Sequence, residues 1–236
     1  MKRGFTIIEI LVVIAIVAVL ATLGLGALRT GFSQAKQVAC ANNMRQIGVA
    51  LTAYASENNG ALPETTHTAA LNRAWIALLE EDLGENYDEF RLCPADPKIN
   101  ERRERGGTSY VLNSYLFVPE IGPFGEPLGT TLNNLNRIPD HSRTLMAFIV
   151  SDRQTVDATS DHTHSRNWGG NWDSLLADIQ PDRHRSGSAS ADHSRGSANY
   201  LFVDGHVESW EASDVKRRIE SGDNIATPPG IETGDF

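Results

Sequence analysis

The chain has 236 residues and a formal net charge of −9, from 21 basic and 30 acidic side chains. This length leaves room for one domain with its own hydrophobic core beside an N-terminal anchor. The acidic balance disfavours nucleic acid as a partner, because phosphate groups are repelled by a negatively charged surface.

The N-terminus joins two basic residues, Lys2 and Arg3, to an apolar run from Phe5 to Leu28 that holds one charge, Glu9. As a helix this run spans about 36 Å, enough to cross a bilayer. The basic residues predict a cytoplasmic N-terminus, with the rest of the chain on the periplasmic side of the inner membrane. A carboxylate in an apolar span costs on the order of a few kcal/mol unless it is paired, so Glu9 is a candidate functional residue. The alternative is an ordinary signal anchor in which Glu9 has no role.

The small residue Gly4 precedes the apolar run, whereas a conventional secretory signal has its small-residue cleavage site after the run. Gly4 followed by Phe5-Thr6-Ile7-Ile8-Glu9 resembles the class III leader of type IV pilins and type II secretion pseudopilins. The resemblance implies that a prepilin peptidase and methyltransferase cuts after Gly4 and methylates the amine of Phe5. It also implies that Glu9 pairs with the Phe5 amine of a neighbouring copy or related pseudopilin, in a helical filament assembled on an inner-membrane platform.

Residues 29–59 predict a continuation of the first helix. They lack proline and place Val38, Ile47 and Leu51 close to helical spacing, and Asn58-Asn59-Gly60 is a stop signal. The predicted organisation is therefore a cleaved leader at 1–4, a transmembrane and filament-core helix at 5–28, an amphipathic helix at 29–59, a globular domain at 60–220 and a flexible tail at 221–236.

The sequence of the globular domain predicts one short helix and four strands. The helix covers 69–83, and the strands, rich in β-branched, aromatic and aliphatic residues, cover 109–118, 144–150, 199–203 and 206–210. Asp204-Gly205 between the last two strands predicts a type I′ hairpin, in which both central residues have positive φ. The predicted fold is α+β and pilin-like: a long N-terminal helix packed on a small antiparallel β-sheet.

The hairpin carries a second resemblance. His193, Asp204 and Gly205 are similar to the C-terminal signature of a pseudopilin-like group common in Planctomycetes and Verrucomicrobia, in which a histidine precedes Asp-Gly by nine residues. Here ten residues separate His193 from Asp204, and His184 is the competing equivalent. Two further stretches resemble landmarks of that group: Cys40 with Asn43-Met44-Arg45-Gln46-Ile47-Gly48, and Cys93-Pro94.

Both cysteines, Cys40 and Cys93, fall in the part of the chain that is expected to face an oxidising compartment. A disulfide between them would tie the helix to the first part of the globular domain and contribute about 3–4 kcal/mol by loop-closure arithmetic. The alternative is two separate buried thiols. Metal binding is not expected of two cysteines so far apart in the sequence.

Several histidines and aspartates near the C-terminus are possible metal ligands by type, but their spacing matches no known ligand pattern, so we interpret them as solvated loop residues. They are His162, His164, His184, His193 and His206, with Asp161, Asp182, Asp192 and Asp204. No cofactor is expected. Calcium is the one alternative, with Asp204 and nearby carbonyl groups as the candidate ligands, because calcium requires oxygen donors.

No nucleophile elbow, phosphate-binding loop, zinc-protease helix or Ser-His-Asp spacing is present in the sequence, so we do not expect an enzyme. We expect a structural subunit of a type II secretion pseudopilus, assembled through its N-terminal helix to help drive protein export. The first alternative is a type IV pilin or minor pilin of an extracellular fibre for adhesion, motility or DNA uptake. The second is a membrane-anchored periplasmic binding domain.

Overall fold

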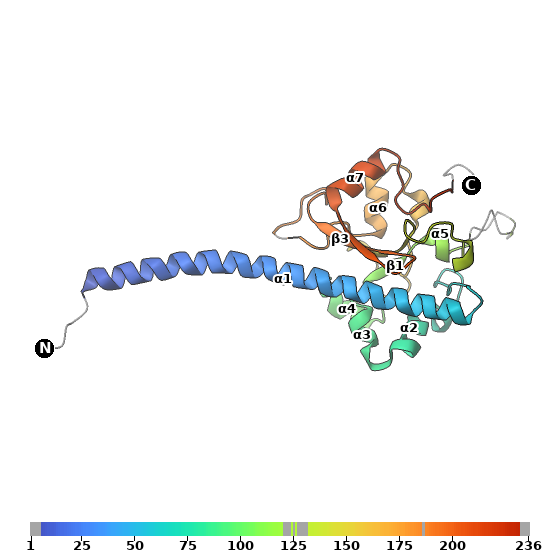
Figure 1. Cartoon of the computed structure of the whole chain (residues 1–236), viewed down its shortest axis with the longest axis horizontal. Coiled ribbons are helices and arrows are strands. Elements are labelled where there is room, and N and C mark those ends of the chain that lie inside the picture. The colour runs from blue at the N-terminus through green and yellow to red at the C-terminus, as the bar shows by residue number, and fades with distance from the viewer. Residues whose placement is uncertain (1–5, 120–123, 125, 127–131, 186, 232–236) are drawn as a thin grey trace.

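The computed structural model describes residues 6–119, 124, 126, 132–185 and 187–231, apart from the side chains of residues 21–29, 82 and 85. A single long helix, α1 (Ile7–Glu57), runs from the N-terminal end, and its second half packs against a globular head (Figure 1). The predicted α+β fold is confirmed: an N-terminal helix lies on a small antiparallel sheet. The strands are β1 (Tyr110–Leu112), β2 (Leu145–Ile149), β3 (Ser197–Phe202) and β4 (Val207–Glu211). The other α-helices are α2 (Trp75–Leu83), α3 (Tyr87–Phe90), α4 (Ile99–Glu104), α5 (Ser114–Phe117), α6 (Trp172–Asp178) and α7 (Ala212–Glu220), and 3₁₀ turns cover Leu71–Arg73, Gly84–Asn86, Leu135–Arg137 and Ser165–Asn167.

The 51 residues of α1 are continuous and are capped at both ends. At the far end, Asn59 and Gly60 adopt left-handed conformations with φ of 56° and 84°. The Gly60 N–H then donates to the Ala55 carbonyl at 2.7 Å, which satisfies one of the last helical acceptors. The predicted helix end at residues 58–60 is confirmed.

The described residues include no helix that is both long and apolar enough to cross a membrane. The predicted span at 5–28 includes Phe5 and the side chains of residues 21–28, which lie outside the described residues, so the span stays a prediction.

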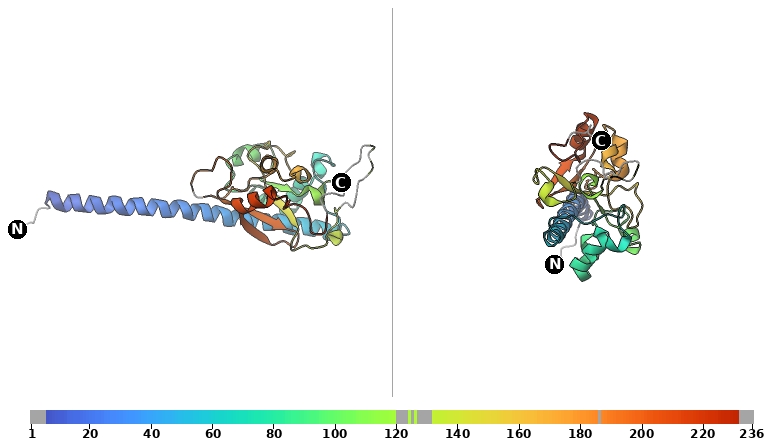
Figure 2. Two further views of the ribbon diagram at one scale, coloured as in Figure 1. Left: turned by 90° about the horizontal axis from the view of Figure 1, so that it is seen from above. Right: turned by 90° about the vertical axis from the view of Figure 1, so that its right-hand side faces the viewer.

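The sheet has the strand order β1-β2-β3-β4, with every neighbouring pair antiparallel. Strand β3 packs directly on α1. A Cβ atom at Gly48 of α1 would lie 3.1 Å from Leu201 Cδ1, so glycine at this position permits the close approach of helix and sheet. Helices α6 and α7 lie on one side of α1, and α2, α3 and α4 lie on the other (Figures 1 and 2).

Two predicted elements are shorter in the structure. The strand predicted at 109–118 ends at Leu112, and Ser114–Phe117 form helix α5 instead. The Asn113 side chain causes this change, because its Oδ1 accepts from the Tyr115 N–H at 3.1 Å and caps the helix. The helix predicted at 69–83 begins as an α-helix only at Trp75.

The β3–β4 hairpin is present, but the predicted type I′ turn is wrong. Gly205 has a φ of 87°, whereas Asp204 does not have a positive φ. The Gly205 N–H donates to the Phe202 carbonyl at 3.0 Å, and the Phe202 N–H donates to the His206 carbonyl at 3.0 Å. This is a three-residue loop in which glycine supplies the left-handed residue of a bulge, the next commonest hairpin connection after the two-residue turns.

The prediction of a flexible tail at 221–236 is wrong for its first part. Ile225 and Ala226 are buried in the core with exposed fractions of 5 % and 0 %. The Ala226 carbonyl accepts from Asn113 Nδ2, and Asn224 Nδ2 donates to the Ser165 carbonyl, both at 2.8 Å. The globular domain therefore extends past its predicted end at residue 220, while residues 232–236 lie outside the described part of the chain.

Candidate functional site

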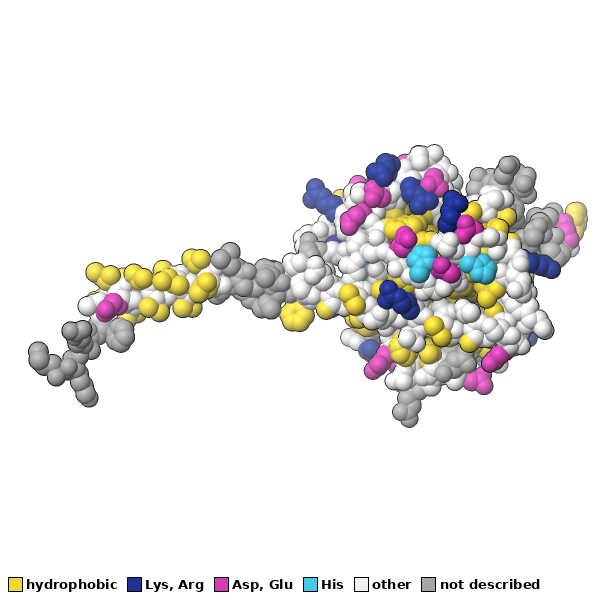
Figure 3. Space-filling model, viewed as in Figure 1, with side chains coloured by type: hydrophobic (Ala, Val, Ile, Leu, Met, Phe, Trp, Pro, Cys, Tyr) yellow, Lys and Arg dark blue, Asp and Glu magenta, His cyan; other side chains and the backbone are white. Residues whose placement is uncertain are grey.

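The first part of α1 carries large apolar side chains that are exposed. Its large apolar side chains between Ile7 and Leu20 are 52 % to 80 % exposed, and they cover the face of the helix that Figure 3 shows. We call residues 7–20 the exposed apolar segment. Burying such a side chain is worth about 1.5–3 kcal/mol, so a segment of this kind gains a large free energy from any apolar surroundings.

Glu9 is the acidic residue of the exposed apolar segment, and it takes part in a capping box with Thr6. Its carboxylate accepts from the Thr6 N–H at 2.8 Å and from Thr6 Oγ1 at 2.9 Å, and the Glu9 N–H donates to Thr6 Oγ1 at 3.3 Å. A carboxylate is favourable at the positive end of a helix. The structure thus places the predicted assembly residue in the first turn of α1, where it is exposed. The two processing residues, Gly4 and Phe5, lie outside the described residues.

The second half of α1 is bound to the head, and its buried residues begin at Cys40. Met44, Ile47 and Leu51 follow Cys40 at helical spacing, and all are buried. Polar contacts flank this stripe, since Asn43 Nδ2 donates to the Leu92 carbonyl at 2.9 Å. Any force or contact on the exposed apolar segment is therefore passed to the head through one continuous helix.

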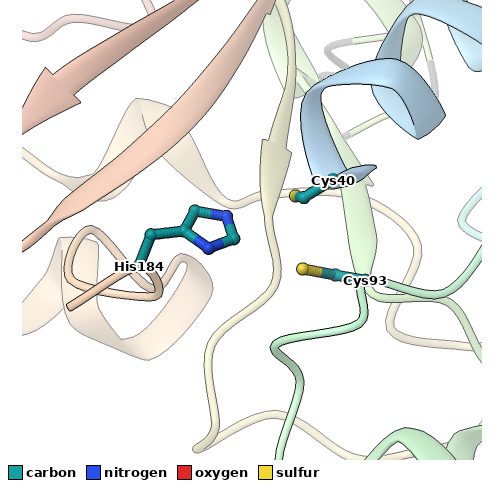
Figure 4. Close-up of side chains that lie close together, drawn as sticks. All are labelled: Cys40, Cys93 and His184. Carbon is teal, nitrogen blue, oxygen red and sulfur yellow. The ribbon is translucent and has the colours of Figure 1, made fainter. Parts of the chain in front are cut away.

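Cys40 and Cys93 are both buried and are free thiols in the structure. Their sulfur atoms and a ring nitrogen of His184 lie within 4.8 Å of one another. The two sulfurs face the imidazole, with Cys40 on α1, Cys93 on the loop that precedes α4 and His184 on the loop that precedes β3 (Figure 4). The structure thus brings the predicted cysteine pair together, and it adds His184, which the sequence had indicated as a possible metal ligand by type and as an alternative to His193, but not as a partner of the cysteines.

The electrostatics of the two thiols differ. Burial raises the pKa of Cys40, and the neighbouring Cys93 raises it further. Burial also raises the pKa of Cys93, but the adjacent Cys40 thiol and the His184 imidazole outweigh it and lower that pKa below its usual value. Cys93 is therefore the thiol of the pair that ionises first. A bond between the two sulfurs stays a prediction.

His193, Asp204 and Gly205, the residues that resemble the C-terminal signature, do not form one site. His193 lies before β3, where its Nδ1 is 3.1 Å from Asp182 Oδ2. Asp204 lies beyond the other end of β3, where its carboxylate is 2.5 Å from His206 Nδ1 and accepts from the His206 N–H. The two therefore occupy opposite ends of the strand, with Gly205 serving the hairpin turn.

The remaining histidines and aspartates pair locally. His162 Nδ1 is 2.7 Å from Asp161, and His164 Nδ1 is 3.1 Å from Asp178. Within the described part of the chain, a close group of three or more histidine, cysteine, aspartate or glutamate ligand atoms occurs only at Cys40, Cys93 and His184. Sequence spacing gave no sign of this group, because its members come from three distant segments.

A long N-terminal helix that begins with the exposed apolar segment and packs on an α+β head is consistent with the class of pilin-like subunits. Residues 1–25 match the family model of the prokaryotic N-terminal methylation motif. This motif supports a pilin-like or pseudopilin subunit that is processed by a prepilin peptidase and assembles into a pilin-like filament. No curated protein and no solved structure matches the chain.

Proposed function

We propose that this chain is a structural subunit of a type II secretion pseudopilus, which assembles through the exposed apolar segment and helps to drive protein export. The observation that carries the proposal is this segment, since residues 7–20 are exposed, are apolar apart from Glu9, and continue into the part of α1 that is packed on the head. A surface this apolar is unusual for a free domain and marks an interaction site. Before assembly the segment lies in the inner membrane, with the head in the periplasm.

Glu9 has a defined role in this proposal. When neighbouring copies surround the exposed apolar segment, the capping bonds from Thr6 leave the net negative charge of the carboxylate uncompensated. A cation at the same depth removes this cost, and the methylated amine of a neighbouring chain supplies one. Head-to-tail pairing of this kind does not close on itself, and it therefore builds a helical filament.

The test compares Glu9→Gln with a matched control, Glu57→Gln, at the opposite, exposed end of the same helix. Each variant replaces the native chain in cells, and antibody to the head is used for immunogold electron microscopy and for blots of the sheared surface fraction. We expect wild-type label confined to the cell envelope, with export of secreted proteins lost in Glu9→Gln and retained in Glu57→Gln.

Long labelled surface fibres in wild-type cells would instead make the chain a type IV pilin. Unchanged export and assembly in Glu9→Gln would contradict both filament functions. That result would favour a membrane-anchored binding domain, in which the N-terminal segment serves only as an anchor.

A further inference from the structure

Three segments of the chain meet at the group formed by Cys40, Cys93 and His184 (Figure 4). Both cysteines are completely buried, and His184 is 4 % exposed. The donors are two thiols and an imidazole, the set that thiophilic metal ions prefer over calcium or magnesium.

The His184 imidazole is unsatisfied. Neither Nδ1 nor Nε2 has a hydrogen-bond partner, although both are buried. A buried polar atom without a partner costs about 1–3 kcal/mol, and native proteins contain few of them. The orphaned ring faces the two sulfurs, so its position points to a ligand held between the three side chains.

The backbone around each donor is fixed. The Cys93 carbonyl accepts from the Asp96 N–H at 2.9 Å, and His184 exchanges two backbone hydrogen bonds with Ser197 at 2.8 Å and 2.9 Å. Gly196 allows the His184 loop to approach β3, because a Cβ there would lie 3.1 Å from the His184 carbonyl oxygen. Backbone contacts thus hold Cys93 and His184 in place, and the Cys93 sulfur and the His184 ring nitrogens take no part in these contacts.

We propose that Cys40, Cys93 and His184 bind one Zn²⁺ ion at the junction of α1 and the head. Zinc–sulfur bonds of about 2.3 Å and zinc–nitrogen bonds of about 2.0–2.1 Å place such ligand atoms about 3.5–4 Å apart. The three donors, already within 4.8 Å of one another, need to close by at most about 1.3 Å. Two thiolates and one Zn²⁺ are neutral together, so the buried site gains no net charge, and the thiol protons are released on binding.

A disulfide is the competing use of the two sulfurs. It would join α1 to the Cys93 loop, but it would leave both His184 ring nitrogens without a partner. Zinc coordinates one of them and accounts for the orientation of the ring. The neighbouring Tyr110 hydroxyl, 3.5 Å from Cys40 Sγ, stabilises a thiolate by donating to it.

The test uses the full chain, purified in detergent under nitrogen with a phosphine reductant. Bound metal is measured by mass spectrometry, and Co²⁺ is then titrated as a spectroscopic probe for zinc. We expect about one ion per chain and a thiolate-to-cobalt charge-transfer band that Zn²⁺ abolishes. Cys40→Ser and Cys93→Ser should lose the band, and His184→Gln should weaken binding by more than about tenfold. The matched control His193→Gln, on the same loop but bonded to Asp182, should bind like wild type.

The wild-type titration decides the question even if a cysteine variant fails to fold, which far-ultraviolet circular dichroism would show. A reduced, folded wild-type chain that takes up neither zinc nor cobalt would overturn the proposal. So would a chain isolated with a Cys40–Cys93 disulfide that binds no metal after reduction, or a His193→Gln variant that loses binding together with His184→Gln. Reduction of such a disulfide followed by stoichiometric, His184-dependent cobalt binding would support the site.

Discussion

The ion pair between Asp96 and Arg102 is completely buried and holds the loop that carries Cys93. The Arg102 Nε atom lies 2.9 Å from Asp96 Oδ2, which also accepts from Ser109 Oγ at 2.7 Å. Asp96→Ala leaves the guanidinium buried without a counter-charge, and breaking such a pair costs about 3–5 kcal/mol. With a urea m-value of about 2 kcal/mol/M, the unfolding midpoint should fall by about 2 M.

The assay is urea unfolding of the full chain in detergent, followed by tryptophan fluorescence, because Trp75 and Trp168 are buried in the head. Arg103→Ala is the control. Arg103 is the next residue of α4, and its partner Asp88 lies 3.9 Å away with both side chains about half exposed. Exposed pairs contribute about 0–1 kcal/mol, so this variant should leave the midpoint nearly unchanged.

A double variant distinguishes the free energy lost with the ion pair from the cost of leaving the Arg102 guanidinium buried without Asp96. Arg102→Met removes the guanidinium and fills part of its volume, and replacing a whole buried pair by apolar groups is often close to neutral. Asp96→Ala with Arg102→Met should therefore be more stable than Asp96→Ala alone. A loss below about 1 kcal/mol in Asp96→Ala, or a double variant less stable than the single one, would refute the reasoning.

Three further predictions concern helix packing, pH and the C-terminal segment. Gly48→Leu should destabilise the head by about 1–3 kcal/mol in urea unfolding because the added side chain meets β3, whereas Gly31→Ala, with open space around it, should change stability by about 1 kcal/mol or less. The hydrogen bond to Asp178 raises the pKa of His164 above its usual value of 6.5, against the effect of burial, so the pair stabilises the fold below that value and the contribution is lost as pH rises through the folded pKa. His164→Gln should then lower the urea midpoint more at about pH 5.5 than at about pH 8.5, and an equal loss at both would contradict the pairing. Ile225→Ala should cost about 2–5 kcal/mol in the same assay, while no loss would mean that this segment is not part of the core.

Elements with a strong local signal could be predicted from the sequence. The end of α1 follows from Asn59 and Gly60, which adopt the left-handed conformations that stop a helix. The positions of β2, β3 and β4 follow from short runs of strand-forming residues. Local patterns failed where tertiary contacts decided the outcome: Asn113 caps α5 inside a predicted strand, and Ile225 is buried within a stretch whose Pro-Pro-Gly composition favours a free tail.

The two candidate sites also differ in whether their signal in the sequence is local. Glu9 could be predicted because its signal, one charge in an apolar run, is local. The cluster at Cys40, Cys93 and His184 could not, because no sequence spacing relates a helix to two distant loops. Only the packing of β3 on α1 brings His184 to the cysteines. Sequence reasoning predicted the cysteine pair from the compartment, and it had no physical reason to add the histidine.

The location of this cluster matters for a subunit that assembles through one end of a helix. Among the described side chains of α1, Cys40 is the first that is fully buried, so the buried contact of α1 with the head begins there. A pull on an assembled exposed apolar segment acts first on the polar contacts that precede this residue, and then on Cys40. Just before it, Gln37 Nε2 donates to Ser197 Oγ at 3.1 Å, and the Gln37 carbonyl accepts from Asn199 Nδ2 at 2.8 Å. These neutral hydrogen bonds contribute only about 0.5–1.5 kcal/mol each. A metal ion or a covalent bond at Cys40 would therefore hold α1 to the head more strongly at this point than these hydrogen bonds do.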